Sequence, residues 1–463
     1  MIQVIPTSSA WLVRRARAAH QFGSLALLAI VPMALHAQDT SRSVLPAGGM
    51  ITLQDAIRIA LVQNTAVRFA RNTLTVDSLN IRQSRNQFQP NLSGSSSSSQ
   101  GFGAGTNGQG SFSLSAGLSS GITIYNGSQN RNILRQAQIG ARAGVHDLGR
   151  TRQSVAFAVA SEFLALITQQ EQLRVQQENL TAQEQELTQL EQFVRQGTRP
   201  IGDLYQEQAA VASTRLALVN ARRATEVAKV NLIQELVLDP RLDYSFATPS
   251  DTGTGSLPTF NLDSLMSVAF QQRVDLRAQE LRVQAAQTEI KIAEGGRLPV
   301  VTGSAGYSSG FNTSNDGGFA SQLNQRRGGS VGVGVSIPIL DRGSVSIARQ
   351  RAQIQLENEV LILRDQQQAV ALDVRRANLD YLSAGEQLSA AGAQQRAAAL
   401  ALEAAQARYR VGLATFIEVT LARASLIQAQ SAVVSARSNV VFQRALMSYY
   451  TGVLDPASVT LGG

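Results

Sequence analysis

The sequence predicts an α+β membrane protein built from a tandem duplication, with strands of an outer-membrane β-barrel continued by long coiled-coil helices. Three observations support this fold class. The two halves of the 463-residue chain repeat the same order of patterns, strand-like segments alternate apolar and small polar residues, and helix-like segments carry apolar residues every seven positions. Each half is therefore expected to supply both strands and a helical hairpin.

The first 37 residues have the features of a secretory signal peptide. Arg14, Arg15 and Arg17 give a positive start, the apolar stretch FGSLALLAIVPMAL follows, and LHA ends at Ala37. The apolar run is short for a membrane-spanning helix, which needs about twenty apolar residues. We therefore expect residues 1–37 to direct export and to be removed.

Charge and composition exclude several classes of function. Loss of the three signal arginines lowers the formal charge from +8 to +5, and no Lys or Arg block indicates nucleic-acid binding. The chain has no cysteine, so it can neither form a disulfide nor carry a lipid attached to a cysteine. His146 is the only histidine after the signal, so we expect no metal site, no cofactor and no enzyme activity.

The internal repeat divides the mature chain into two structural repeats, expected over residues 38–240 and 260–456. The stretch ITLQDAIRIALVQNTAVR matches FNLDSLMSVAFQQRVDLR at a shift of 209 positions, the shift later becomes 215, and both halves end in VLDP. A linker containing Pro, Gly and Thr is expected over residues 241–259, and a C-terminal tail over residues 457–463.

Each repeat begins with a helix that is expected to end near a proline, Pro90 or Pro299. The residue before a proline is disfavoured in a helix, so strands are expected to begin there. The expected barrel strands cover residues 91–102 and 111–125 in the first repeat, and 300–311 and 329–341 in the second.

The strand pattern is typical of an outer-membrane barrel, although a half-buried strand of a soluble sheet alternates in the same way. Apolar residues occupy the even positions from Phe112 to Ile124 except Ser120, and small polar residues occupy most odd positions. In the second repeat, small residues alternate with Val331, Val333, Val335, Ile337 and Ile339. The first strand, NLSGSSSSSQ, has almost no apolar face.

Four strands are too few to enclose an aqueous lumen, because about eight are needed. Several chains must therefore share one barrel. Three chains would supply about twelve strands and leave no edge exposed to lipid, but the pattern by itself leaves the number of chains open.

The remaining segments predict two long helical hairpins, at about residues 128–236 and 344–450. Apolar residues recur every seven positions from Val159 to Val194, with largely apolar equivalents 215 positions later. A sustained repeat of seven predicts left-handed coiled-coil packing. At 1.5 Å per residue, the longest proline-free helix would extend roughly 100 Å.

A glycine-containing turn joins the two helices of each hairpin, QGTRP in the first and VGLAT in the second. Gly197 and Gly412 suit the left-handed conformation that ends a helix. Arg195 and Arg410 precede them, where a cation complements the helix dipole. We expect both turns at the end of the hairpins opposite the strands.

Taken together, the signal, the duplication, the proline-initiated strand pairs, the heptads and the RYRVGL…FIEV turn resemble the TolC-like outer-membrane efflux channel family across essentially the whole mature chain. The resemblance implies a homotrimer in outer membrane lipid, with a 12-stranded barrel and a helical tunnel in the periplasm. It also implies a periplasmic adaptor protein and an inner-membrane transporter of RND, ABC or MFS type as partners. The implied function is the passive exit duct of a tripartite efflux pump that exports small molecules.

The resemblance assigns roles to residues of the turns. The residues implied to contact the adaptor are Val411, Gly412, Leu413, Gln196, Gly197 and Thr198. Tyr409 and Asp203 fall on a gating network, and Glu418 falls on a ring of acids at the periplasmic aperture. Two positions depart from the family pattern, since Ala414 replaces a gating arginine and Leu421 replaces a second ring acid.

A ring of acids at the periplasmic aperture predicts a preference for cations and a change in the pKa of the acids. Three copies of Glu418, with Asp203 as a second ring and no lysine nearby, would favour cations and raise each other's pKa. The alternative is that Glu418 is an exposed acid stabilised by the dipole of its helix.

Two other functions stay open at this point. An outer-membrane component of type I protein secretion would have the same architecture, because the transporter largely selects the cargo. A secreted coiled-coil filament protein would share the heptads but would not fractionate with outer membranes.

Overall fold

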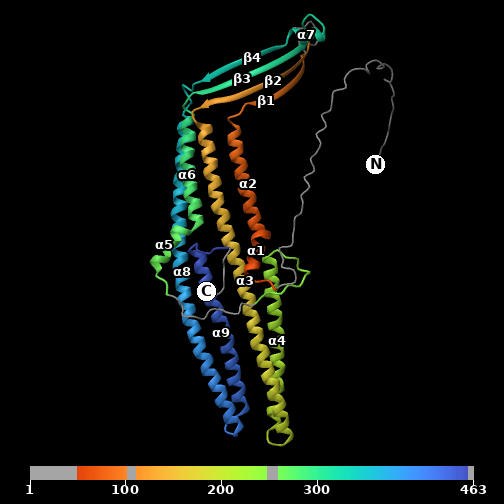
Figure 1. Cartoon of the computed structure of the whole chain (residues 1–463), viewed down its shortest axis with the longest axis vertical. Helices are drawn as coiled ribbons and strands as arrows, with labels where there is room; N and C mark the ends of the chain where they lie inside the picture. The colour runs from red at the N-terminus through yellow and green to blue at the C-terminus, as the bar shows by residue number, and fades with distance from the viewer. Residues whose placement is uncertain (1–49, 102–110, 248–258, 457–463) are drawn as a thin grey trace, which may run out of the picture. The chain divides into compact units, whose positions relative to one another are not determined.

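The computed structural model describes residues 50–101, 111–247 and 259–456. Within these ranges the chain forms nine helices and four strands (Figure 1). The expected signal peptide and C-terminal tail lie outside the described residues, as does most of the linker.

The helices and strands follow the same order in both repeats. The first repeat contains α1 (Leu53–Gln63), α2 (Thr65–Asn86), β1 (Asn91–Gly101), β2 (Ser111–Asn126), α3 (Gln129–Arg195) and α4 (Ile201–Glu235). The second contains α5 (Leu262–Gln272), α6 (Val274–Gly295), β3 (Val300–Asn312), α7 (Phe319–Gln325), β4 (Gly328–Ser336), α8 (Ser344–Arg410) and α9 (Phe416–Tyr450). Helices α3 and α8 both have 67 residues, and α4 and α9 both have 35. The tandem duplication expected from the sequence is thereby confirmed.

The start of each repeat differs from the expectation of a single helix, because two helices meet there. At Asn64 the backbone leaves the helical region (φ −58°, ψ 131°), and the side chain accepts a hydrogen bond of 2.9 Å from the Ala66 N–H. Asn64 therefore ends α1 and caps α2. The equivalent break in the second repeat is at Arg273, a buried side chain paired with Asp275.

The four strands form an antiparallel sheet in the order β1-β2-β3-β4. Three pairs of serine hydroxyls join β1 to β2 across one face at 2.7–2.8 Å, namely Ser93–Ser119, Ser97–Ser115 and Ser99–Ser113. The other face carries apolar pairs such as Leu118 opposite Tyr307. β1 therefore pairs along its whole length although it lacks an apolar face, because backbone and hydroxyl hydrogen bonds hold it.

Two features of the second strand pair were not expected. β4 ends at Ser336 rather than at residue 341, so Ile337 and Ile339 lie outside the strand. The reason is Pro338, which has no N–H to donate to a neighbouring strand. In addition, the helix α7 lies between β3 and β4, where the buried Gln322 accepts from the Asn312 N–H at 3.0 Å.

The strand ends connect closely to the helices. Pro90 and Pro299 stand directly before β1 and β3. At the start of α3 the Asn126 side chain accepts from a backbone N–H at 3.2 Å, and at the start of α8 the Asp341 side chain accepts from the Val345 N–H at 3.0 Å. These side chains satisfy N–H groups that a helix leaves unpaired at its first turn.

The largest apolar core surrounds the middle of α3. Phe163, which is 1% exposed, packs edge-on against Phe246 at 6.2 Å between ring centroids. Phe246 also forms a bridge with Ile51. The beginning of the expected irregular linker therefore belongs to the core of the first repeat.

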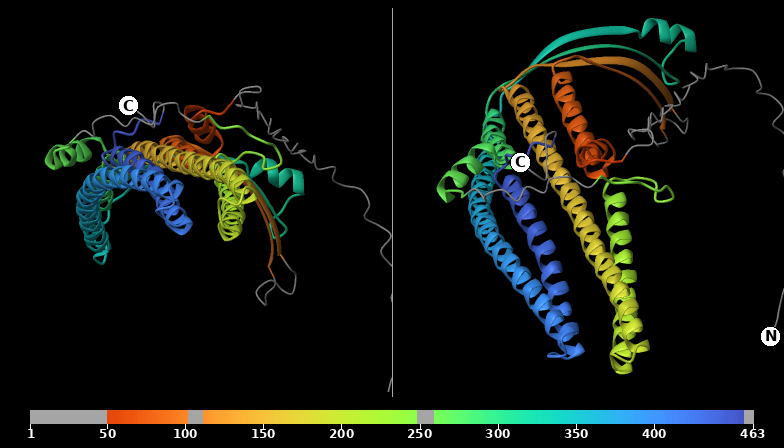
Figure 2. Two further views of the ribbon diagram at one scale, coloured as in Figure 1. Left: turned by 90° about the horizontal axis from the view of Figure 1, so that it is seen from below. Right: turned by 60° about the horizontal axis from the view of Figure 1, so that its bottom comes forward.

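The helices lie side by side in a fixed order. Towards the turns, α8 packs on α9 and α3 on α4, whereas α9 meets α3 around the middle of α3, at Thr168 and Gln172 (Figure 2). Beside the sheet, α2 packs on α3, α3 on α6, and α6 on α8. Every heptad position from Val159 to Val194 is buried or half-buried, as are the equivalents from Val374 to Tyr409. The predicted seven-residue packing is confirmed.

The core around α3 generates a first prediction. Phe163→Ala should lower the free energy of unfolding by about 3–5 kcal/mol, because it removes a buried ring and leaves a cavity. Phe69→Ala is the matched control, since this α2 side chain is 75% exposed, and should change the value by less than about 0.5 kcal/mol. Denaturant unfolding followed by circular dichroism measures both. Equal effects of the two variants would contradict the assignment of the core.

Candidate functional site at the hairpin turns

Each hairpin turn is closed by the same pair of backbone hydrogen bonds. In the first, the Gly197 N–H donates to Val194 O at 2.9 Å and the Thr198 N–H to Phe193 O at 3.0 Å. In the second, the Gly412 N–H donates to Tyr409 O at 3.0 Å and the Leu413 N–H to Arg408 O at 2.9 Å. Both sets form a Schellman motif, which requires a left-handed residue. Gly197 and Gly412 have φ values of +70° and +80°.

The turns present apolar side chains and open backbone to solvent. Val411 and Leu413 are 70% and 71% exposed, and Gln196 and Thr198 are also exposed. A Cβ atom added to either turn glycine would meet no heavy atom within 4 Å. The residues expected to contact an adaptor are therefore accessible in the single chain.

Tyr409 and Asp203 connect the two hairpins. The Tyr409 hydroxyl donates to Asp203 Oδ2 at 2.6 Å, and the Arg199 guanidinium lies 4.1 Å from the centre of the tyrosine ring. Arg199 also donates to Tyr409 O at 2.7 Å. Burial and the hydrogen bond to Asp203 raise the pKa of Tyr409, so the hydroxyl stays a donor. The structure brings together the two residues that the resemblance placed in one network.

Glu418 lies in the first turn of α9 and forms a capping box with Thr415. Arg408 is 3.3 Å from the Glu418 carboxylate, so an arginine, which the expectation of no nearby lysine did not consider, partly neutralises this acid. The hydrogen bond with the Thr415 backbone N–H, together with Arg408, lowers the pKa of Glu418. In the single chain, Glu418 therefore agrees with the alternative interpretation, in which it is an acid in the first turn of a helix and is stabilised by the helix dipole.

The two positions that depart from the family pattern carry no charge into this region. Ala414 is half-buried within the second turn, and Leu421 is 64% exposed on α9. Charged contact between the hairpins therefore comes from other residues.

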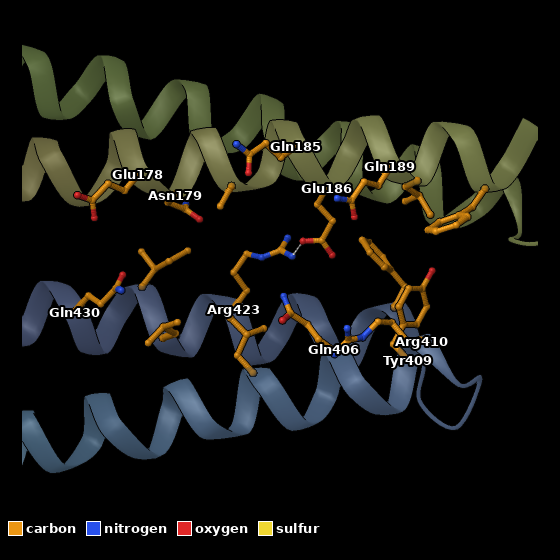
Figure 3. Close-up of a pocket in the computed structure, with 17 residues that line it drawn as sticks. Glu178, Asn179, Gln185, Glu186, Gln189, Gln406, Tyr409, Arg410, Arg423 and Gln430 are labelled. Atoms are coloured by element: carbon orange, nitrogen blue, oxygen red, sulfur yellow. Dashed lines mark hydrogen bonds and ion pairs between the residues drawn. The ribbon is translucent and has the colours of Figure 1, made fainter.

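A cavity of about 530 Å³ separates α3 of the first hairpin from α8 and α9 of the second (Figure 3). Arg423 of α9 and Glu186 of α3 point toward each other across it and form an ion pair. Arg423 also lies 3.3 Å from Glu207 of α4, which is completely buried. Tyr409 and Arg410 line the same cavity.

Four residues of this region were not expected from the sequence, namely Arg199, Arg423, Glu186 and Glu207. The only local signal was position, because Glu207 lies four residues after Asp203, on the same face of α4, and Arg423 lies about two turns into α9. In the sequence, these contacts could have been suspected only from charged residues that stand where the helix pattern favours apolar ones.

Two features that the described residues lack bear on chemistry. Among residues 50–101, 111–247 and 259–456, no helix combines the length and apolar character needed to cross a membrane. In the same part of the chain, no cluster of three or more His, Asp or Glu side chains is placed to hold a metal ion.

Comparison with known proteins identifies the family. The model of the family described as outer membrane efflux protein matches residues 56–236 and 265–452. Outer membrane protein TolC of Vibrio cholerae is 25% identical over 348 residues, which cover 75% of this chain and 78% of that protein. Outer membrane efflux protein BepC of Brucella suis is 25% identical, with 84% and 83% covered.

A solved structure of CusC shares the fold. It superposes with a TM-score of 0.75 at 20% sequence identity and covers 86% of this chain and 92% of that one. The α+β fold class expected from the sequence, with repeated strands and long helical hairpins, is confirmed, and so is the expected family resemblance. The chain belongs to the outer membrane efflux protein family, whose members reside in the outer membrane with their helices in the periplasm.

Proposed function

We propose that the chain assembles as a homotrimeric channel and serves as the passive exit duct of a tripartite pump for small molecules. A periplasmic adaptor binds the hairpin turns, and an inner-membrane transporter supplies the energy, so the channel itself makes and breaks no bond. One observation carries this proposal. Both the sheet and the layer of helices end at edges that a second copy of the chain can complete.

The sheet has two free edges within the described residues, because β1 pairs only with β2 and β4 only with β3. Lipid cannot satisfy the backbone N–H and C=O groups of such edges. Joining β1 of one copy to β4 of the next is a head-to-tail contact, which closes into a ring. Three copies give about twelve strands, enough to surround a lumen.

The helix layer ends in the same way. Towards the turns, Leu379 and Leu400 of α8 occupy the same heptad position, three heptads apart, and are 57% and 66% exposed. On α4, at the opposite end of the helix order, Leu216 and Val230 are 63% and 57% exposed. An exposed heptad stripe is a coiled-coil seam without a partner, and α4 of a neighbouring copy supplies one.

The barrel strands offer no charge to select cargo. None of the residues of β1, β2, β3 and β4 is Asp, Glu, Lys or Arg. The acidic and basic side chains of Asp203, Glu418 and Arg408 lie instead at the hairpin turns. Control over passage therefore belongs to the turns, and the barrel serves as a wide neutral exit.

Assembly is tested directly in isolated outer membranes. The protein should migrate as a trimer without heating and as a monomer after boiling, because the β1–β4 contacts need heat to open. Gel migration and fractionation on a density gradient measure this. A soluble fraction containing all of the protein would support the coiled-coil filament instead.

The adaptor contact is tested at Gly412. Gly412→Trp should abolish drug resistance in cells that contain the adaptor and the transporter, because the indole fills the open space at the turn. Gly343→Trp is the matched control. Gly343 has a φ of +78° and an equally open Cβ position, but it lies at the start of α8, away from the turns.

Trimer abundance separates the adaptor role from the helix-ending role of Gly412. Equal trimer levels in Gly412→Trp and Gly343→Trp, with resistance lost only in the former, are the expected result. Normal resistance in Gly412→Trp would contradict the adaptor contact. A trimer lost only in this variant would assign Gly412 to helix termination alone.

The aperture charge is tested at Glu418. Glu418→Gln removes the charge but retains the capping box, since Gln also suits this position. In planar bilayers it should weaken the preference for cations over anions, because a ring of carboxylates favours cations. Glu403→Gln, an exposed acid of α8, should leave the preference unchanged. Unchanged reversal potentials in Glu418→Gln would place the constriction elsewhere in the tunnel.

A further inference from the structure

The short helix α7 packs on the apolar face of the sheet. Its first residue, Phe319, contacts Phe311 of β3 edge-on, with 5.2 Å between the ring centroids. The Ser309 hydroxyl donates a hydrogen bond of 2.6 Å to the Leu323 carbonyl. Phe311 stands opposite Leu114 of β2, and Ser309 is two positions away, so both side chains share the face that carries the apolar pairs. α7 therefore covers part of this face and leaves the serine face free.

Hydrogen bonds from one buried side chain fix the position of α7. Gln322 is 3% exposed, and its amide nitrogen donates to the Asn315 and Gly317 carbonyls, each at 2.9 Å. Its amide oxygen accepts from the Asn312 N–H at 3.0 Å. These bonds join the end of β3, the following loop and α7. The side chains of this connection are therefore held in a defined place beside the sheet.

Two arginines follow α7 and directly precede β4. Arg326 and Arg327 are both exposed, and neither forms an ion pair with another described residue. Because Gly328 pairs with Ser308, the antiparallel register places both arginines near the level of Phe311. The strands themselves carry no charged residue. The two guanidinium groups thus stand where the uncharged surface of the sheet ends.

Exposed apolar side chains continue along the same face next to the arginines. Val331 and Val333 of β4 are 89% and 70% exposed, and Tyr307 of β3 is 52% exposed. Val331 pairs with Ala305, two positions before Tyr307, which places these side chains on the face that α7 covers. A molecule that matches this surface has an anionic group beside a long apolar part.

The place of α7 along the sheet agrees with the outer surface of a membrane. It lies at the end of the sheet far from α6 and α8 (Figure 1). Phe311 comes ten residues after Val301, and a tilted strand crosses the hydrocarbon core in about 9–11 residues. Phe112 lies beside Phe311, at 6.5 Å between ring centroids. Aromatic side chains gather at the membrane–water interface of such barrels, so the arginines stand among the lipid head groups.

We propose that Arg326 and Arg327, together with Phe319 and Val331, form a binding site for a phosphate-bearing lipid of the outer leaflet. This inference rests on the proposed channel function, since it requires the apolar face to meet lipid. A guanidinium binds phosphate through paired, charge-assisted hydrogen bonds. The aromatic ring and the valine contact the acyl chains. A free phosphate ion would gain only the charged contacts, so the ligand is the lipid.

The site lies beside the boundary between copies in the proposed trimer. The arginines are continuous with β4, the edge strand that joins β1 of the next copy. A ligand that binds the assembled state stabilises that state by mass action. The bound lipid therefore strengthens the trimer as well as contacting one chain, and three copies provide three sites.

The first test counts lipids bound to full-length trimers in detergent by native mass spectrometry. The probe is lipid A that carries two phosphates, and up to three molecules should bind per trimer. Arg326→Gln combined with Arg327→Gln should weaken binding by at least about tenfold, because charge-assisted hydrogen bonds to phosphate are lost. Arg222→Gln combined with Arg223→Gln is the matched control, since these residues form an adjacent exposed pair on α4. The control should bind lipid A as the wild type does.

The second test separates the phosphate from the apolar part of the ligand. Dephosphorylated lipid A should bind the wild type and the Arg326→Gln, Arg327→Gln variant with equal, weak affinity. Phe319→Ala should weaken binding of both forms of lipid A, whereas Phe69→Ala, at an exposed position on α2, should weaken neither. Excess inorganic phosphate should leave the lipid in place. Displacement by inorganic phosphate alone would contradict the lipid and indicate a site for a free anion.

The third test measures the temperature at which the trimer becomes a monomer on gels. Saturating lipid A with two phosphates should raise this temperature in the wild type, because binding favours the assembled state. The rise should be absent in the variant with both arginines replaced and should persist in the Arg222→Gln, Arg223→Gln control. An equal rise in the wild type and in the variant with Arg326 and Arg327 replaced would overturn the role of the arginines.

The outcomes separate this inference from the channel proposal. A wild-type protein that forms no trimer and no conductance contradicts the channel itself. Conducting wild-type trimers that bind the two forms of lipid A equally well contradict the lipid site alone. If the variant with both arginines replaced does not assemble, this comparison of two lipids on the wild type decides, because only a phosphate-binding site distinguishes them.

Discussion

The packing of α3 is the interaction on which the rest of the chain depends. This one helix contacts α1, α2 and α4 of the first repeat and α6 and α9 of the second. Its buried apolar side chains, with Phe163 at the centre, remove the largest apolar surface of the chain from water. Because α3 begins directly after β2 and ends at the first hairpin turn, the length of this helix sets the distance between the sheet and that turn. Without α3, the two repeats would share no apolar core.

Two glutamates near the turns, Glu418 and Glu207, have different roles because their surroundings differ. Glu418 is exposed, capped by Thr415 and close to Arg408, and its pKa is lowered. Glu207 is fully buried, and its pKa is raised to about 7. Desolvation disfavours the charged form of an acid, while backbone N–H groups and cations favour it. An exposed acid therefore supplies a permanent charge at the tip, whereas the buried one can take up a proton near neutral pH.

The sequence predicted the elements whose signals are local and periodic. The heptads located the hairpin helices, and Gly197 and Gly412 located the turns, because each depends on neighbouring residues along one chain segment. Local signals also failed in identifiable ways. Asn64 splits a helix without any glycine or proline to indicate it, and alternation continues through Ile337 although Pro338 ends the strand. Register and capping depend on hydrogen-bond partners that a periodic pattern does not contain.

By itself the sequence determined the duplication, the alternation of strands and hairpins, and the family resemblance, because all three are repeated patterns along the chain. Only the tertiary structure decided which side chains meet between the hairpins. Arg423 and Glu207 are 216 positions apart, and Tyr409 and Asp203 are 206 apart. Contact over such separations depends on which helix faces pack together and how far one helix is shifted along the other. A heptad repeat predicts which residues of each helix are buried. Several alignments of one helix along another bury those residues equally well, so polar pairs between the helices select one alignment. Those pairs can be identified only from the packed helices.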